Sequence, residues 1–156
     1  MSTSGTIRVD RPFDELAELL SIRPADWLLP FLRIAAHAGE ATAGRALRIP
    51  SPPGSRRIAI ELLTPEGGDR ISELIVPLRW RTAGFDWVTP SYAGRLHVRR
   101  LSARSCEIVL DGSYILPAGV TDGAHAAAAE VAVHVTISTL LRSFAVAVEE
   151  QARQTG

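Results

Sequence analysis

From Arg56 to Tyr114, apolar residues recur at every second position in four runs, and charged or polar residues fill the positions between them. Such period-two alternation is typical of antiparallel strands that bury one face and leave the other in water. The turns between the runs are short, so neighbouring runs are expected to pair. The positions predicted to share the buried face are Ile58, Ile60, Leu74, Val76, Leu78, Leu96, Val98, Ile108 and Leu110.

The chain after this sheet is predicted to form the helix that covers its buried face. Gly123 to Gln151 is predicted to form one helix, roughly 40 Å long at 1.5 Å per residue. Its apolar stripe comprises Val133, Ile137, Leu140, Leu141, Phe144 and Val148. A helix this long and this apolar on one side must lie on the buried face of the sheet. The 156 residues therefore predict one α+β domain, with a largely antiparallel sheet of about six strands under a long C-terminal helix.

Before the sheet, the sequence predicts a short first strand at Thr6 to Val9 and then two helices. Pro12 has a fixed backbone angle suited to the start of a helix, and apolar residues then recur at helical spacing to about Ser21. A second, less regular helical stretch follows from Ala25 to Ala43, with Pro30 at an early turn or a kink.

The composition excludes several classes of function. The 17 basic and 17 acidic residues cancel, so no net field exists to attract nucleic acid or an anionic membrane. Every basic residue is arginine, so no lysine is available to form a Schiff base. The single cysteine, Cys106, cannot form an intrachain disulfide and is expected to be a small buried hydrophobe.

Patterns for a metal, a cofactor or targeting are missing from the sequence. His37, His97, His125 and His134 are scattered without the spacing of metal ligands, and no glycine-rich phosphate loop is present. The polar N-terminal segment lacks the apolar region of a signal sequence, and no apolar run approaches the roughly 20 residues of a membrane span. We expect a cytoplasmic protein that uses no cofactor.

Five segments carry a resemblance to a known superfamily. They are Phe13-Asp14-Glu15-Leu16-Ala17-Glu18-Leu19-Leu20, Ala25-Asp26-Trp27-Leu28-Leu29-Pro30, Pro77-Leu78-Arg79-Trp80, Thr89-Pro90-Ser91-Tyr92-Ala93-Gly94-Arg95-Leu96 and Asp111-Gly112-Ser113-Tyr114-Ile115-Leu116-Pro117-Ala118-Gly119. With the order of elements, they resemble the helix-grip (SRPBCC) superfamily: START-like lipid-transfer domains, Bet v 1-like proteins and bacterial polyketide aromatase/cyclases. The resemblance spans nearly the whole chain, and none of its motifs is catalytic. It implies a curved antiparallel sheet of six to seven strands around a long C-terminal helix, two short helices after the first strand, and an apolar cavity.

Trp80 and Tyr114 are the most informative candidates for that cavity, because they are aromatic, carry a polar group and lie in phase with the buried face. Plain core packing is the alternative for both. His134 borders the apolar stripe and is either a polar anchor for a ligand or a half-buried histidine. The residues predicted to line the ligand site are Trp80, Tyr114, His134, Ile137, Leu78, Val98, Leu110 and Leu141. Phe85 and Trp87 lie in a loop that could form a pocket rim or a homodimer contact.

Three functions follow from this sequence. The first is binding of a hydrophobic or amphipathic small molecule, lipid-like or polyketide-like, between the sheet and the C-terminal helix. The second is an enzyme of the polyketide cyclase type, for which Tyr114, His134 and Arg142 are the candidates for proton transfer. The third is a structural or interaction module without a pocket, since Ala126 to Ala129 allow the helix to pack closely. The apolar stripe, with one histidine at its margin, favours holding a ligand over transforming one.

Overall fold

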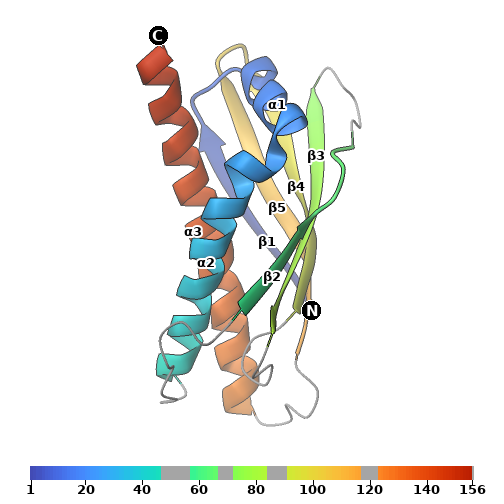
Figure 1. Ribbon diagram of the computed structural model, residues 1–156, viewed down its shortest axis with the longest axis vertical. Coiled ribbons are helices and arrows are strands. Elements are labelled where there is room, and N and C mark those ends of the chain that lie inside the picture. Colours follow the sequence, from blue (N-terminus) through green and yellow to red (C-terminus); the bar gives the residue numbers. More distant parts are fainter. Residues whose placement is uncertain (47–56, 67–71, 84–90, 117–122, 156) are drawn as a thin grey trace.

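A computed structural model of the chain describes residues 1–46, 57–66, 72–83, 91–116 and 123–155. Within these residues the chain forms five strands and three helices (Figure 1). In chain order they are β1 (Ser2–Val9), α1 (Phe13–Ile22), α2 (Pro24–Ala46), β2 (Arg57–Leu62), β3 (Glu73–Ala83), β4 (Ser91–Ser102), β5 (Ser105–Ile115) and α3 (Gly123–Thr155). The loop with Phe85 and Trp87 lies outside the described residues.

The strands form one antiparallel sheet in the order β1-β5-β4-β3-β2. The long helices α2 and α3 run side by side across one face of this sheet, and α1 lies at one end of it (Figure 1). We call the face under the helices the inner face and the opposite face the outer face. The inner face is the one that the period-two alternation predicts to be buried.

Side chains of the inner face form the core, as predicted. The buried residues among the predicted positions are Leu74, Val76, Leu78, Leu96, Val98, Ile108 and Leu110. Ile60 is partly buried against this core, and the side chain of Ile58 lies outside the described residues. The predicted stripe of α3 is buried in full, through Val133, Ile137, Leu140, Leu141, Phe144 and Val148. Burial of one such aliphatic side chain contributes about 1.5–3 kcal/mol.

The structure corrects two expectations. The described part of the chain has five strands, so the expected six to seven strands are wrong. The second helix is not short, because α2 has 23 residues, whereas α1 has 10 and is short as predicted.

α2 continues through Pro30, although proline inside a helix costs about 3 kcal/mol. Tertiary packing outweighs this cost, because α2 buries a stripe at helical spacing and α3 is the element it contacts most extensively. The stripe comprises Leu28, Leu32, Ala35, Ala36, Gly39 and Ala43. A local rule about proline could not anticipate this packing.

Small residues let α2 and α3 approach closely. At Gly39, an added Cβ atom would overlap the Oγ1 atom of Thr136 and the backbone carbonyl of Ala132. One turn further along α2, Ala43 packs with Ala128 and Ala132 of α3. The two helices therefore form a closely packed layer over the inner face.

β1 approaches α3 through a second glycine. A Cβ atom at Gly5 would lie 2.5 Å from Cγ2 of Ile137 and 3.1 Å from Cδ1 of Leu141. Both side chains are buried, so α3 lies directly on β1 at this point. A larger residue at position 5 would push the helix away from the sheet.

The C-terminal half of α3 is held by α1, α2 and the turn before α1. The buried Arg11 donates a hydrogen bond from Nη1 to the carbonyl oxygen of Val148 at 2.9 Å and another from Nε to Glu15 at 3.1 Å. Phe31 of α2 meets Phe144 edge to face, with 6.4 Å between ring centroids. A buried guanidinium with paired donors is a specific contact, so it fixes the position of α3.

α3 is long and apolar enough to cross a membrane by length and composition, which the sequence analysis did not anticipate. Half of its most apolar window is buried inside the protein, and it packs on α2, β1 and β5. This packing is that of the core helix of a soluble domain. The cell compartment stays a prediction.

Cys106 is buried, as predicted. Burial raises the pKa of its thiol to about 11, although the nearby Arg100 acts in the opposite direction. The thiol is therefore protonated at neutral pH and is a poor nucleophile.

The outer face carries a charged network centred on His97. Its Nδ1 atom lies 2.8 Å from Oε1 of Glu73, and its Nε2 atom lies 3.4 Å from Oδ1 of Asp111. Arg99 donates a hydrogen bond from Nε to the same Glu73 oxygen at 3.2 Å. Hydrogen bonds from His97 and then Arg99 hold the pKa of Glu73 below its usual value of 4.5.

This lowered pKa predicts a pH dependence. Glu73 stabilises the fold fully above about pH 4.5, and that contribution is lost as the pH falls through its lower native pKa. Urea unfolding at a series of pH values from neutral to acidic measures the loss. We expect the Glu73→Gln variant to lose less stability than the wild type over the acid range. An equal loss in both proteins would contradict this assignment.

The α2–α3 contact predicts the effect of a single methyl group. We expect Gly39→Ala to destabilise the protein by about 1–3 kcal/mol, because overpacking against a backbone carbonyl exceeds the gain of about 1 kcal/mol from helix propensity. Gly123→Ala, where an added Cβ meets nothing within 4 Å, is the control and should be neutral or stabilising. Urea unfolding of both variants makes the comparison, and a stabilised Gly39→Ala variant would refute the close contact.

Candidate functional site

Three aromatic residues form a row across one end of the inner face. Trp80 of β3 pairs in register with Tyr92 of β4, which pairs with Tyr114 of β5. The Trp80 and Tyr92 rings stack with 4.1 Å between centroids and 18° between planes. All three side chains are buried. We call Trp80, Tyr92 and Tyr114 the aromatic row.

The next row along the sheet is almost empty of side chains. It consists, in register, of Leu78, Gly94, Gly112 and Thr3, from β3, β4, β5 and β1. The phenol of Tyr92 leans over the two glycines, because a Cβ atom would lie 2.6 Å from its Oη atom at Gly94 and 2.7 Å at Gly112. Any larger residue at either glycine would displace the Tyr92 hydroxyl. The sheet therefore provides a hollow made for this side chain.

Two buried hydroxyl groups in these rows have no hydrogen-bond partner among the described residues, namely Tyr92 Oη and Thr3 Oγ1. Tyr92 is 2% exposed and Thr3 is 8% exposed, so water from the surface does not solvate them. Thr3 pairs in register with Gly112, over which the Tyr92 hydroxyl lies. A buried polar group without a partner costs about 1–3 kcal/mol. Two such groups at neighbouring positions are candidates for contact with a polar atom of another molecule.

The surroundings of Tyr92 and Tyr114 keep both phenol groups neutral. Burial raises the pKa of Tyr92 far above its usual value, and the negative charge of Asp111 adds to the effect. Burial also raises the pKa of Tyr114, with a smaller contribution from Glu130. Both phenols are therefore protonated hydrogen-bond donors at neutral pH and weak acids.

Two cations border the inner face: the N-terminal ammonium group of Met1 donates a hydrogen bond to the backbone carbonyl oxygen of Tyr114 at 2.9 Å, and Arg100 lies at the other end of β4 from Tyr92. Arg100 stacks over the Phe13 ring at 5.2 Å and donates to Asp14 at 3.0 Å. It belongs to the contact between β4 and α1. The aromatic row is thus apolar and uncharged, apart from its hydroxyl groups.

The structure brings most of the predicted ligand residues to one layer. Trp80, Tyr114 and Leu78 belong to the two rows just described, and Leu110 and Val98 follow further along the inner face. Ile137 and Leu141 cover β1 from α3. Contact of these residues with a ligand stays a prediction.

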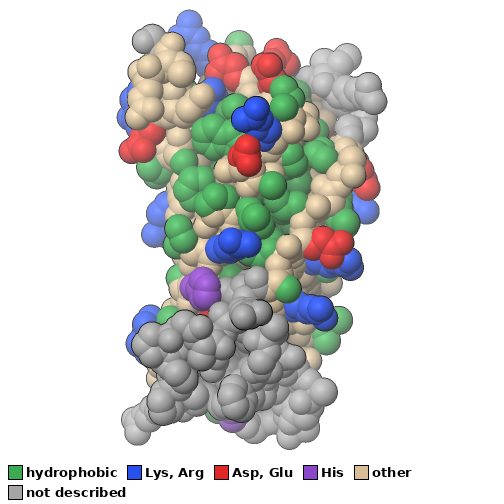
Figure 2. Space-filling model, in the orientation of Figure 1, with side chains coloured by type: hydrophobic (Ala, Val, Ile, Leu, Met, Phe, Trp, Pro, Cys, Tyr) green, Lys and Arg blue, Asp and Glu red, His purple; other side chains and the backbone are tan. Residues whose placement is uncertain are grey.

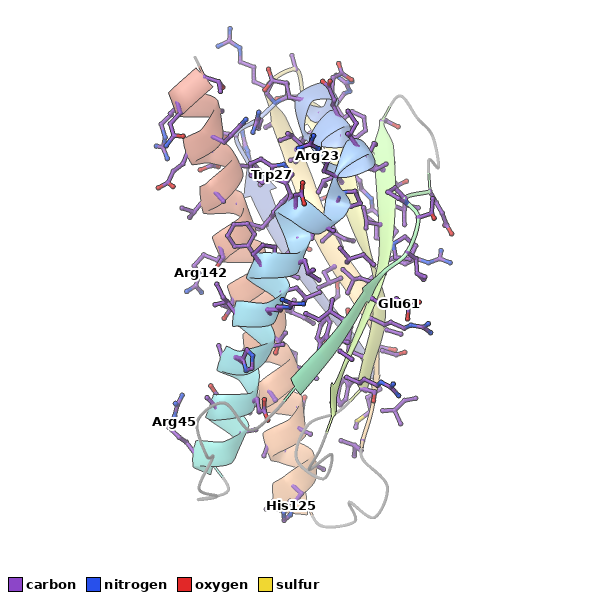
Figure 3. The ribbon with its side chains drawn as sticks, in the orientation of Figure 1. Arg23, Trp27, Arg45, Glu61, His125 and Arg142 are labelled. Carbon is purple, nitrogen blue, oxygen red and sulfur yellow. The ribbon has the colours of Figure 1, made fainter. Side chains whose placement is uncertain are left out.

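His134 stands apart from this layer. Its side chain is 56% exposed, and Nε2 lies 3.7 Å from Oε1 of Glu130. Together with Arg142, which projects outward from α3 (Figure 3), it lines a shallow groove of about 260 Å³ between α3 and β1. The inward-facing Tyr114 is therefore not joined with His134 and Arg142 in one constellation.

Sequence reasoning missed Tyr92, Thr3, Gly94 and Gly112. A signal was present, since Tyr92 and Gly94 share the phase of Leu96 and Thr3 shares the phase of Val9. The expected first strand, Thr6 to Val9, began too late to include Thr3. β1 begins at Ser2 and β4 at Ser91, so these residues lie inside strands.

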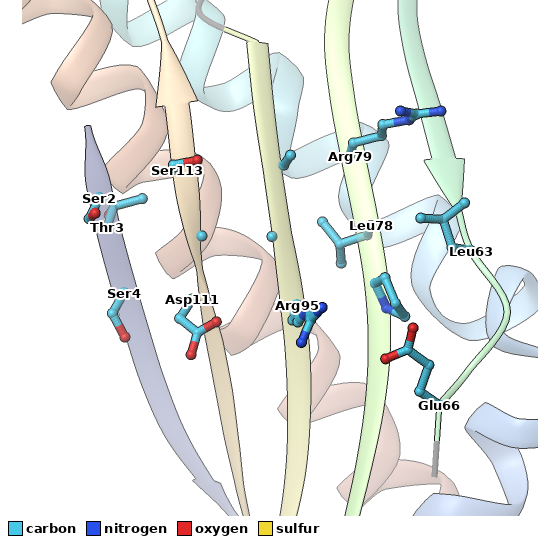
Figure 4. Close-up of a pocket in the computed structure, with 14 residues that line it drawn as sticks. Ser2, Thr3, Ser4, Leu63, Glu66, Leu78, Arg79, Arg95, Asp111 and Ser113 are labelled. Atoms are coloured by element: carbon cyan, nitrogen blue, oxygen red, sulfur yellow. The ribbon is translucent and has the colours of Figure 1, made fainter. Parts of the chain in front are cut away.

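The outer face also holds an open groove, of about 920 Å³ (Figure 4). Ser4, Asp111 and Arg95 project into it from three neighbouring strands, and Glu66 borders it on the side of β3. Its charged groups include both signs and are open to solvent. Thr3, whose buried hydroxyl group is unpaired among the described residues, also lines this groove, as do Leu78, Gly94 and Gly112. Tyr92, which carries the other unpaired hydroxyl group, does not line it, so the two hydroxyl groups together favour the inner face.

No protein-family model and no curated protein matches the sequence. Several solved structures match its fold. The ZhuI aromatase/cyclase from Streptomyces sp. R1128 aligns with a TM-score of 0.52 at 17% identity, covering 100% of this chain and 98% of that chain. A START superfamily protein from Mycobacterium smegmatis aligns with a TM-score of 0.44 at 14% identity, covering 99% of both chains. A norcoclaurine synthase from Thalictrum flavum aligns with a TM-score of 0.42 at 11% identity, covering 88% of this chain and 94% of that chain.

The likeness to the aromatase/cyclase, together with the order of elements, defines the fold. It is the START/Bet v 1-like helix-grip fold, as the sequence resemblance implied. In this chain the described sheet is an open one of five strands. At 17% identity the likeness extends to the fold alone, because one fold hosts many unrelated functions.

The unpaired hydroxyl groups predict an unusual stability effect. We expect Tyr92→Phe and Thr3→Val to stabilise the ligand-free protein by about 1 kcal/mol each, because each removes a buried group without a partner. Thermal unfolding should show this as a rise in Tm of about 2–4 °C. Tyr114→Phe is the matched control, since its hydroxyl has a contact with Met1 Sδ at 3.5 Å, and it should give no gain. A destabilised Tyr92→Phe variant would show that a bound water satisfies the hydroxyl.

Proposed function

We propose that this domain binds a hydrophobic or amphipathic small molecule between the inner face of the sheet and α3. The observation that carries the proposal is the pair of buried, unpaired hydroxyl groups of Tyr92 and Thr3 within an apolar interior. Binding sites for small molecules are typically apolar surfaces with a few placed polar groups. The inner face has that composition at the aromatic row.

The ligand's contacts follow from the layer already described. Its body packs against the aromatic row and the aliphatic residues Leu78, Val98 and Leu110, under Ile137 and Leu141 of α3. Its polar atom lies at Tyr92 and Thr3 instead of at His134, whose side chain is mostly in solvent.

The core also reaches the surface beside α2, where hydrophobic side chains gather in the upper half of Figure 2. Partly buried residues that belong to this core include Trp27, Phe31, Ile60 and Leu62.

The raised pKa values of the two phenol groups favour binding over catalysis. General acid–base catalysis works best with a group whose pKa lies near the working pH. Burial raises the pKa values of Tyr92 and Tyr114 away from neutrality, so they hold a hydrogen bond well but transfer a proton poorly. A cyclase-type reaction would need an additional acid or base beside the aromatic row.

A second candidate is a packed module without a ligand. The close contact at Gly39 and the cluster of Ala43, Ala128 and Ala132 favour it, because they fill the space between α2 and α3. These contacts lie between the helices and not on the aromatic row. Ligand binding therefore distinguishes the two candidates directly.

The experiment is a titration with a panel of environment-sensitive fluorescent fatty acids and flat aromatic dyes. We expect saturable binding of at least one probe by the wild type. Ile137→Trp, which places a larger side chain between α3 and β1, should weaken binding at least tenfold. Tyr114→Trp tests the aromatic row in the same way, in case the α3 variant folds poorly.

The matched control is Val131→Trp, which adds the same side chain at an exposed position of α3. It should bind like the wild type, and circular dichroism should show that all variants are folded. Absence of saturable binding across the panel, or equal binding by folded Ile137→Trp and Tyr114→Trp variants, would reject the proposed function.

A further inference from the structure

The two unpaired hydroxyl groups belong to neighbouring positions of the inner face. Tyr92 reaches across β4 so that its Oη atom lies over Gly94 and Gly112, and Thr3 stands beside Gly112 on the neighbouring strand β1. The other member of this row, Leu78, is apolar. Backbone carbonyl groups in the middle of a sheet are occupied by the strand ladders. The protein therefore presents two donors at these positions without an acceptor from the described chain.

We infer that the ligand of the proposed function carries a neutral carbonyl oxygen, which accepts hydrogen bonds from both Tyr92 and Thr3. This inference rests on the proposed function and specifies the chemistry of its ligand. A carbonyl oxygen has two lone pairs, so one atom satisfies both donors. An alcohol in the same place would bring a proton of its own and would need a further acceptor.

The charges around these hydroxyl groups exclude a carboxylate as the buried end. A buried anion needs a cation or several charge-assisted hydrogen bonds to offset its desolvation. The N-terminal ammonium group is engaged with the backbone carbonyl oxygen of Tyr114, and Arg100 is engaged with Phe13 and Asp14 at the far end of the sheet. The nearest charge that acts on the Tyr92 hydroxyl is that of Asp111, which is negative. A neutral acceptor is the group that this environment stabilises.

The aromatic row also points to the shape of the ligand. The Trp80 and Tyr92 rings are stacked, and Tyr114 continues the row in register. Flat conjugated molecules pack well against such rings, in offset or edge-to-face geometry. The inferred ligand is thus a flat, neutral molecule with a carbonyl group at its buried end, beside Tyr92 and Thr3.

Three probes of nearly the same shape test this inference: 2-acetylnaphthalene, 2-ethylnaphthalene and 2-naphthoate. Isothermal titration at neutral pH measures their affinities for the full chain. We expect the ketone to bind about tenfold more tightly than the hydrocarbon, because two hydrogen bonds are gained. We expect the carboxylate to bind more weakly than the ketone.

Variants assign the preference to the two hydroxyl groups. Tyr92→Phe and Thr3→Val should each reduce the preference for the ketone over the hydrocarbon, and the double variant should abolish it. Ser102→Ala, the control that removes a hydroxyl group at the opposite end of β4 from Tyr92, should retain it. The hydrocarbon should bind all four proteins alike, which shows that the apolar site is intact.

The outcomes separate this inference from the proposed function. Binding of ketone and hydrocarbon with equal affinity, a preference that survives in the double variant, or tightest binding of the carboxylate would each overturn the inference and leave hydrophobic binding standing. If none of the probes binds and the fluorescent panel also fails, both the inference and the proposed function are rejected.

Discussion

The structure depends on how closely α3 approaches its neighbours. Two glycines make the approach possible, since Gly39 lets α2 meet α3 and Gly5 lets β1 meet α3. A five-stranded sheet has a limited inner face, and one helix beside it would leave part of that face in water. The long α2, packed against α3, closes the layer. The position of α3 relative to the aromatic row follows from these contacts.

The sheet under these helices separates its side chains by kind, with charged ones on the outer face and apolar ones on the inner face. The outer face holds the ion pairs of His97, Glu73 and Arg99, where solvent screens them. The inner face is aliphatic and aromatic, and its hydroxyl groups at Tyr92 and Thr3 are unpaired in the described chain. Evolution of a core for stability alone would favour phenylalanine and valine at these positions. The proposed function accounts for these hydroxyl groups through a molecule that binds there.

The regular parts of this fold were predictable from the sequence, and its exceptions were not. Alternation assigned Leu96 and Ile108 to the core because sheet phase is a local property. The helical stretch predicted from Ala25 to Ala43 lies within the observed α2, Pro24–Ala46, whereas the resemblance implied a short helix. The local pattern was the better guide here, because apolar spacing continues past Pro30. The aromatic row was found in part, through Trp80 and Tyr114. Tyr92 was missed because its role depends on Gly94 and Gly112, which only the strand register brings beneath it.

The central claim is that the spot between Tyr92 and Thr3 is a place for a ligand atom. A crystal structure of the protein soaked with 2-acetylnaphthalene tests it most directly. The account predicts the carbonyl oxygen within about 3 Å of both Tyr92 Oη and Thr3 Oγ1, with the naphthalene rings against the aromatic row. An ordered water bridging the two hydroxyl groups, with the probe bound elsewhere, would contradict it.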